Sequence, residues 1–270
     1  MWVRLIVSGV AVVLVVVLYL LPKVVVDNEQ EQNAGAIGDT SSPDLADSHD
    51  RQLTENEQAA VSSLKDGFNA ELNPEKSATF ADSLAGLFSD LNYLDSAAYY
   101  YGVSADQEPS MARWLKAGEA YFEAYSYAVE LDRQQHFGKS ARKYFSLALA
   151  EDAELYDVQA KVGLTYLPDQ PMQAVLQLRE VVENDPTNQL GLYNLGLLSI
   201  QSQQFDKAVE RFESLVSSHP DHLEGQFYLA VSYFENGQRE KARAQFERVK
   251  AMEADPEVLT SVDEYLEKLK

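Results

Sequence analysis

A recurrence at a spacing of 34 residues constrains the fold of this chain more than any other feature of its sequence. Two consecutive segments, 189–222 and 223–256, carry similar residues at the same places. The residues related by this spacing are Leu195 and Leu229, Gly196 and Ala230, Ala208 and Ala242, Phe212 and Phe246, and Pro186 and Pro220. Small residues that recur in register mark places where paired helices touch, because a larger side chain would push the helices apart. The sequence therefore predicts an all-α array of helix-turn-helix units.

These positions resemble the tetratricopeptide repeat, a helix-turn-helix unit of about 34 residues with a small residue at place 8, alanine at place 20 and proline near its end. The resemblance covers about residues 78–255 and predicts about five repeats, of which 189–222 and 223–256 are clear. It implies a superhelix of stacked hairpins, an α-solenoid, closed by a capping helix at about 257–270. Repeats of this family are general scaffolds for protein interactions, so the family alone implies little about the partner.

The repeat pattern is weaker upstream. Trp114 and Gly118 fall at places 4 and 8 of one unit, but its Ala141 arrives about 11 residues late. This delay predicts an extended first helix. In the next unit, Gly163 and Ala174 match with one residue missing from the internal turn.

The amino-terminal segment, residues 1–26, predicts one transmembrane helix. Leu5 to Leu21 form an uncharged apolar run between Arg4 and Lys23, and about 20 such residues span a bilayer. A cleaved signal peptide is the alternative, although the run ends without small residues at a usual cleavage distance. The few flanking charges favour a body outside the cytoplasm. The order of the segments, with a membrane anchor followed by a linker and then repeats, is similar to that of bacterial envelope proteins of the family. This resemblance implies a periplasmic repeat domain.

Residues 27–53 predict a disordered linker, because this segment is acidic, polar and almost free of large apolar side chains. Thr54 and Glu57 then form a capping-box pattern that predicts a first helix at about 55–71. We therefore expect the helical repeat domain to span residues 54–270.

The composition excludes several classes of function. The net charge of −21 repels phosphate backbones and argues against a nucleic acid partner. The chain has no cysteine, which excludes disulfides and thiolate catalysis.

The remaining residues suggest no catalytic, metal or cofactor site. His219 and His222 flank Pro220 and Asp221 in the turn between two repeats. Pro220 can stop one helix and Asp221 can cap the next, which explains this segment better than metal binding. The end of a phosphate-loop motif occurs at Gly138, Lys139 and Ser140. The motif also needs a glycine five positions before Gly138, where this chain has Arg133, so we expect a helix start near Gly138 instead. We predict that the chain is not an enzyme.

A partner-binding groove is the main functional prediction. In the resembling family, places 2, 5, 9, 12 and 13 of each first helix line a concave groove, which would receive an apolar or helical segment of a partner, with the acidic residues favouring a basic flank. In the two clear repeats these places are Leu190, Tyr193, Leu197, Ile200 and Gln201, then Glu224, Phe227, Val231, Phe234 and Glu235.

Two alternatives stay open for these surfaces. Neighbouring repeats or the last helix could cover the groove instead of a partner. A second aromatic set could likewise divide between core and an exposed edge; it comprises Tyr99, Tyr100, Tyr101, Tyr121, Tyr125 and Tyr127. The sequence therefore predicts a membrane-anchored interaction scaffold or adaptor, and the alternative is a self-associating structural subunit of an envelope complex whose groove is filled by another copy.

Overall fold

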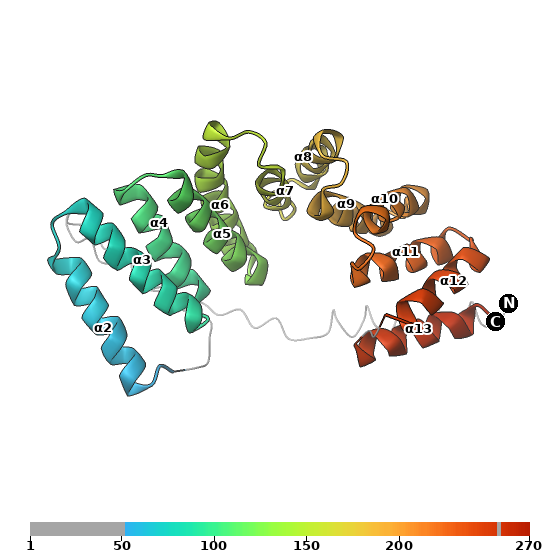
Figure 1. Cartoon of the computed structure of the whole chain (residues 1–270), viewed down its shortest axis with the longest axis horizontal. Helices are drawn as coiled ribbons and strands as arrows, with labels where there is room; N and C mark the ends of the chain where they lie inside the picture. Colours follow the sequence, from blue (N-terminus) through green and yellow to red (C-terminus); the bar gives the residue numbers. More distant parts are fainter. Residues whose placement is uncertain (1–51, 253–254) are drawn as a thin grey trace, which may run out of the picture. The chain divides into compact units, whose positions relative to one another are not determined.

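The computed structural model describes residues 52–252 and 255–270, and within them the chain folds into twelve helices (Figure 1). The predicted membrane anchor and residues 27–51 of the predicted linker lie outside the described residues. None of the described helices is long and apolar enough to cross a membrane. The helices are α2 (Glu55–Ala70), α3 (Pro74–Asp90), α4 (Leu94–Gln107), α5 (Met111–Tyr127), α6 (Leu131–Glu151), α7 (Tyr156–Leu164), α8 (Pro171–Asn184), α9 (Gln189–Gln201), α10 (Phe205–Ser218), α11 (Leu223–Glu235), α12 (Arg239–Lys250) and α13 (Pro256–Lys268).

Three of the helical hairpins turn in the same way. The turns after α3, α9 and α11 each contain one residue in the left-handed region, with φ of 63° at Asn92, 56° at Gln203 and 73° at Gly237. The next amide then donates back to a carbonyl five residues earlier, as Gln204 N does to Ser199 O at 2.8 Å. This is the Schellman termination of a helix, and it fixes the direction in which the following helix leaves.

Alternate helices form a layer of their own. Consecutive helices pack against each other along the described residues, and in addition α7 contacts α9 and α9 contacts α11. Lys161 of α7 also reaches Glu119 of α5, with 2.6 Å between Nζ and Oε1. The odd-numbered helices α5, α7, α9 and α11 therefore lie beside one another, which is the arrangement that lets first helices share a binding face.

The small repeat residues lie where the sequence predicts close helix contacts. Ala208 and Ala242, both at place 20, have no exposed surface. A Cβ atom added at Gly196 would lie 2.5 Å from the Phe212 ring. That distance is below van der Waals contact, so α9 and α10 approach too closely for a larger residue at this point.

The 11 extra residues in the unit that begins with α5 are divided between its two helices. The helix α5 has 17 residues where α9 has 13, so four of the extra residues lie in the first helix. The other seven lengthen the start of α6, which reaches Ala141 ten residues after Leu131, whereas α10 reaches Ala208 three residues after Phe205. The prediction of an extended first helix was therefore only partly correct.

Both ends of the described array have specific caps. Thr54 and Glu57 form both bonds of the capping box at the start of α2, as predicted. At the other end, Asp255 accepts a hydrogen bond from the backbone of Glu257, and Pro256 occupies the first turn of α13. Arg239 and Arg243 of α12 donate to the carbonyls of Lys268 and Leu269. These bonds satisfy backbone acceptors that the end of a helix leaves unpaired.

We predict that Ala208→Leu and Ala242→Leu each lower the free energy of unfolding by about 1–3 kcal/mol, because the added volume must separate closely packed helices. Ala244→Leu is the matched control, since Ala244 is exposed on α12. The measurement is thermal or urea unfolding followed by circular dichroism. Equal stability of all three variants would show that the small residues do not limit the helix spacing.

Candidate functional site

The predicted groove residues lie on two neighbouring odd-numbered helices. The helix α9 carries the first five, and α11 carries the second five. Glu224, Glu235 and Gln201 are exposed, whereas Val231 is buried. The remaining apolar members are partly buried and pack against buried side chains. The set therefore combines exposed polar groups at its ends with an apolar middle that also contributes to the core.

Tyr193 is held in an aromatic cluster between α9, α10 and α11. Its ring stacks on His222 with 5.2 Å between centroids, and it meets Phe212 and Tyr228 edge-on at 6.3 and 6.0 Å. Burial of the phenol, followed by the charges of Tyr228 and Glu224, raises the pKa of Tyr193 to about 12. The ring is thus shielded from water on several sides within the chain itself.

The last helix covers part of the predicted groove. Tyr265 of α13 makes edge contacts with Phe227 at 6.3 Å and with Phe234 at 5.2 Å, and it stacks on Phe246 at 4.8 Å. The sequence left open whether the last helix would cover these aromatics, and the structure places it against both. A partner that used the faces in contact with Tyr265 would have to displace that ring.

The second aromatic set divides between core and surface. Tyr100 is buried and stacks on Phe88 at 5.7 Å, while Tyr121 stacks on Tyr144 at the same distance. The hydroxyl of Tyr125 donates to Leu164 O at 2.8 Å, and burial raises the pKa of Tyr125 to about 12. Tyr127, in contrast, is 73% exposed.

A cavity of about 460 Å³ lies beside Tyr127. Its lining comes from α3, α4, α5 and α7 and includes Leu94, Ala97, Tyr101 and Phe122. Lys116 also lines this cavity, and its Nζ lies 5.0 Å from the centre of the Tyr101 ring. Next to Tyr127, the turn between α5 and α6 exposes Val129 to 87%. The sequence placed Tyr101 and Tyr127 in the aromatic set that could form an exposed edge, but it gave no sign of the cavity between them.

The two histidines of the turn before α11 have structural roles. His219 Nε2 lies 2.8 Å from Thr187 O, and because a carbonyl can only accept, the ring nitrogen donates. His222 Nδ1 accepts from Gly225 N at 3.0 Å and caps α11. An acceptor Nδ1 carries no proton, so its 3.4 Å approach to Glu224 is not a hydrogen bond. Within the described residues, no group of three or more potential ligands is arranged to hold a metal ion.

Gly138, Lys139 and Ser140 lie inside a helix, not at its start. The helix α6 begins at Leu131, so the predicted helix start near Gly138 was wrong. A Cβ atom at Gly138 would lie 3.3 Å from the backbone oxygen of Thr165. This glycine therefore allows α6 to approach the end of α7 closely.

We predict that Tyr193 ionises about two pH units later than a free phenol, because its burial in the folded protein disfavours the charged form. A raised pKa means that its contribution to stability is complete below pH 10 and is lost as pH rises through about 12. Ultraviolet titration of the chain and of Tyr193→Phe tests this, since the difference should contain one group that titrates near pH 12. A difference centred near pH 10 would show instead that the phenol faces open water.

Comparisons with known proteins agree with this architecture. Residues 199–262 match the family model described as Tetratricopeptide repeat. Eighty-one residues are 32% identical to Surface lipoprotein assembly modifier 1 of Neisseria meningitidis serogroup B; this match covers 30% of the chain and 17% of that protein. The chain thus spans less than a fifth of this curated relative.

Solved structures give the same fold. The crystal structure of MamA protein is 18% identical, with a TM-score of 0.50, and the match covers 65% of this chain and 91% of that one. The structure of MamA residues 41 to the end from Desulfovibrio magneticus RS-1 also has 18% identity and a TM-score of 0.50, with 65% and 94% of the two chains covered. At this identity the likeness concerns the fold alone. Together with the repeat match over residues 199–262, it shows an all-α fold of helical repeats similar to tetratricopeptide repeats.

Proposed function

We propose that this chain is a membrane-anchored interaction scaffold that binds a partner protein or peptide along its odd-numbered helices. The family match supports a scaffold, since proteins of this fold class are typically not enzymes. The exposed aromatic residue Tyr127, at the mouth of the 460 Å³ cavity, carries the proposal. Tyrosine is among the residues enriched at binding hot spots, and such anchors lie in or beside pockets of the interface.

The cavity beside Tyr127 suits an apolar anchor with a polar neighbour. Leu94, Ala97 and Phe122 provide apolar wall, while Glu123 and Ser126 provide polar groups. Lys161 is already neutralised by Glu119, because its Nζ lies 2.6 Å from both carboxylate oxygens. An inserted apolar side chain would therefore meet no unpaired charge from Lys161.

The predicted groove on α9 and α11 is the second part of the proposed binding face. Leu190, Leu197 and Ile200 are partly buried and keep some apolar surface for contact. Glu224 and Glu235 are exposed at the two ends of α11. In this proposal they attract the basic flank of a partner, while Tyr193, Phe227, Val231 and Phe234 support the apolar floor.

The proposed location is the bacterial envelope, with the repeats in the periplasm. The uncharged run from Leu5 to Leu21 supports an anchor. The partial similarity to a protein named Surface lipoprotein assembly modifier 1 supports an envelope setting. A tether over residues 27–53 would hold the repeats clear of the head groups.

We expect a photo-reactive p-benzoylphenylalanine in place of Tyr127 to crosslink the intact chain to a partner in membranes of the source cells. The control is the same residue in place of Leu176, which is 53% exposed on α8, among the even-numbered helices. Mass spectrometry identifies the products. Equal crosslinking at both positions would contradict a specific site, and a product made only of two copies of this chain would favour the self-associating alternative.

We also expect the double variant Glu224→Lys and Glu235→Lys to weaken capture of that partner roughly 2- to 30-fold, because exposed ion pairs contribute about 0.2–1 kcal/mol each. Glu240→Lys with Glu247→Lys is the matched control, since both are exposed on α12 and give the same change in net charge. Affinities are measured by biolayer interferometry at two salt concentrations. An equal loss of affinity in both double variants would show that only net charge matters. The groove would then play no part in binding.

A further inference from the structure

A second cavity, of about 230 Å³, lies between α6, α7 and α8. It is lined by Leu149 of α6, Ala153 of the following turn, Gln159 and Val162 of α7, and Gln177 and Glu180 of α8. None of these residues belongs to the predicted groove or to the cavity beside Tyr127. The volume is below the ~300–1,000 Å³ of typical small-molecule sites, so the cavity fits one long side chain better than a whole ligand.

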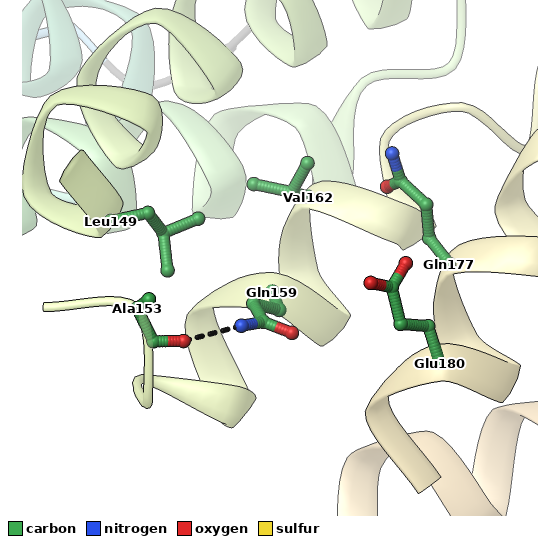
Figure 2. Close-up of a pocket in the computed structure, with 6 residues that line it drawn as sticks. All are labelled: Leu149, Ala153, Gln159, Val162, Gln177 and Glu180. Carbon is green, nitrogen blue, oxygen red and sulfur yellow. Dashed lines mark hydrogen bonds between the residues drawn. The ribbon is translucent and has the colours of Figure 1, made fainter. Parts of the chain in front are cut away.

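Hydrogen-bond acceptors converge on this cavity. Figure 2 shows the side-chain oxygens of Gln159, Gln177 and Glu180 directed toward the space between α7 and α8. The amide nitrogen of Gln159 is already used, because Nε2 donates to Ala153 O at 2.5 Å. Glu180 adds a carboxylate that can only accept when it is ionised, so the cavity presents three side chains with acceptor oxygens.

One of these acceptors is buried and unmet. Gln177 Oε1 is buried and accepts no hydrogen bond from any described residue. Buried acceptors without a donor are rare in proteins, because the amide loses its bonds to water and gains nothing in return. A ligand that brings an N–H group would supply the missing bond.

The surroundings of the cavity are acidic. Glu151 at the end of α6 and Asp152 and Glu154 in the following turn are all exposed, next to the lining residue Ala153. Within the described residues, no Lys, Arg or His side chain forms an ion pair with these carboxylates or with Glu180. Their combined field attracts a positively charged group toward the cavity.

The opposite wall is apolar. Leu149 and Val162 pack against a buried cluster that contains Phe145 and Val158, which fixes their positions. A ligand with an aliphatic stem could lie along these side chains while its charged end reaches the oxygens of α8. This combination of an apolar stem and several N–H donors is the chemistry of an arginine or a lysine.

We propose that this cavity binds the side chain of one arginine that a partner protein presents, with the stem against Leu149 and Val162 and the guanidinium between the oxygens of Gln159, Gln177 and Glu180. Arginine suits the site better than lysine for two reasons. The guanidinium is more weakly hydrated than an ammonium group, so burying it beside Gln177 costs less. Its five N–H donors also spread in one plane and can reach three separate acceptors.

The test uses the full chain in detergent micelles and the peptide acetyl-Gly-Arg-Gly-amide as the probe. Nuclear magnetic resonance of labelled leucine and valine methyl groups reports on the cavity through Leu149 and Val162. We expect saturable shifts of these two residues with the arginine peptide. The same peptide with citrulline, which keeps the shape and loses the charge, should bind at least tenfold more weakly.

Two variants on α8 separate a specific site from general acidity. Glu180→Gln should weaken binding of the arginine peptide at least tenfold, because it removes the carboxylate at the cavity. Glu183→Gln changes the same charge one turn further along α8, where Glu183 lines a different cavity, and should change the affinity less than twofold. Gln177→Leu should also weaken binding, with unchanged helicity by circular dichroism.

Several outcomes would overturn the proposal. These are the absence of saturable shifts at Leu149 and Val162, equal binding of the citrulline peptide, and equal loss in Glu180→Gln and Glu183→Gln. Equal binding of acetyl-Gly-Lys-Gly-amide would overturn the assignment to arginine. The lysine variants at Glu224 and Glu235 should leave probe binding unchanged, so this proposal and the proposed groove can fail separately.

Discussion

The close approach of the two helices in each hairpin is the contact on which the rest of this structure depends. At two hairpins a glycine of the first helix lies directly under a buried phenyl ring of the second: a Cβ at Gly118 would lie 2.4 Å from Phe145, and one at Gly196 would lie 2.5 Å from Phe212. Both rings are fully buried, so they cannot move aside cheaply. The ring fills the space that a larger residue at place 8 would need, and this pairing sets the distance between the helices.

Packing of this kind divides the interior into several small clusters instead of one large core. Each cluster contains buried residues from two to five successive helices. Such an array gains stability from neighbour to neighbour, so its side faces need not be buried for the fold to hold. This explains how α7 can take part in two unrelated surfaces, since Lys161 faces the cavity with Tyr127 while Gln159 and Val162 line the acidic one.

Much of the fold could be predicted because the repeat residues act locally. Glycine and alanine at place 8 report a close contact within one hairpin, and Gly237 fits the left-handed turn without strain. The left-handed turn at Gln203 could not be predicted from the sequence, because glutamine does not favour a positive φ. The Schellman hydrogen bond from Gln204 N to Ser199 O holds it there. The cap of α11 also escaped prediction: the sequence suggested Asp221, but His222 Nδ1 accepts the bond.

The candidate site was harder to predict because it depends on contacts between distant segments. Nothing in the sequence near Phe227 and Phe234 shows that Tyr265 lies against both rings. Arg239 and Arg243 also bind the end of α13, at carbonyls 29 and 26 positions further along the chain. Since Tyr265 occupies the aromatic part of the groove, a partner that contacts those faces must compete with α13. The same partner meets no such competition at Tyr127, so initial binding there costs the protein no internal contact with α13.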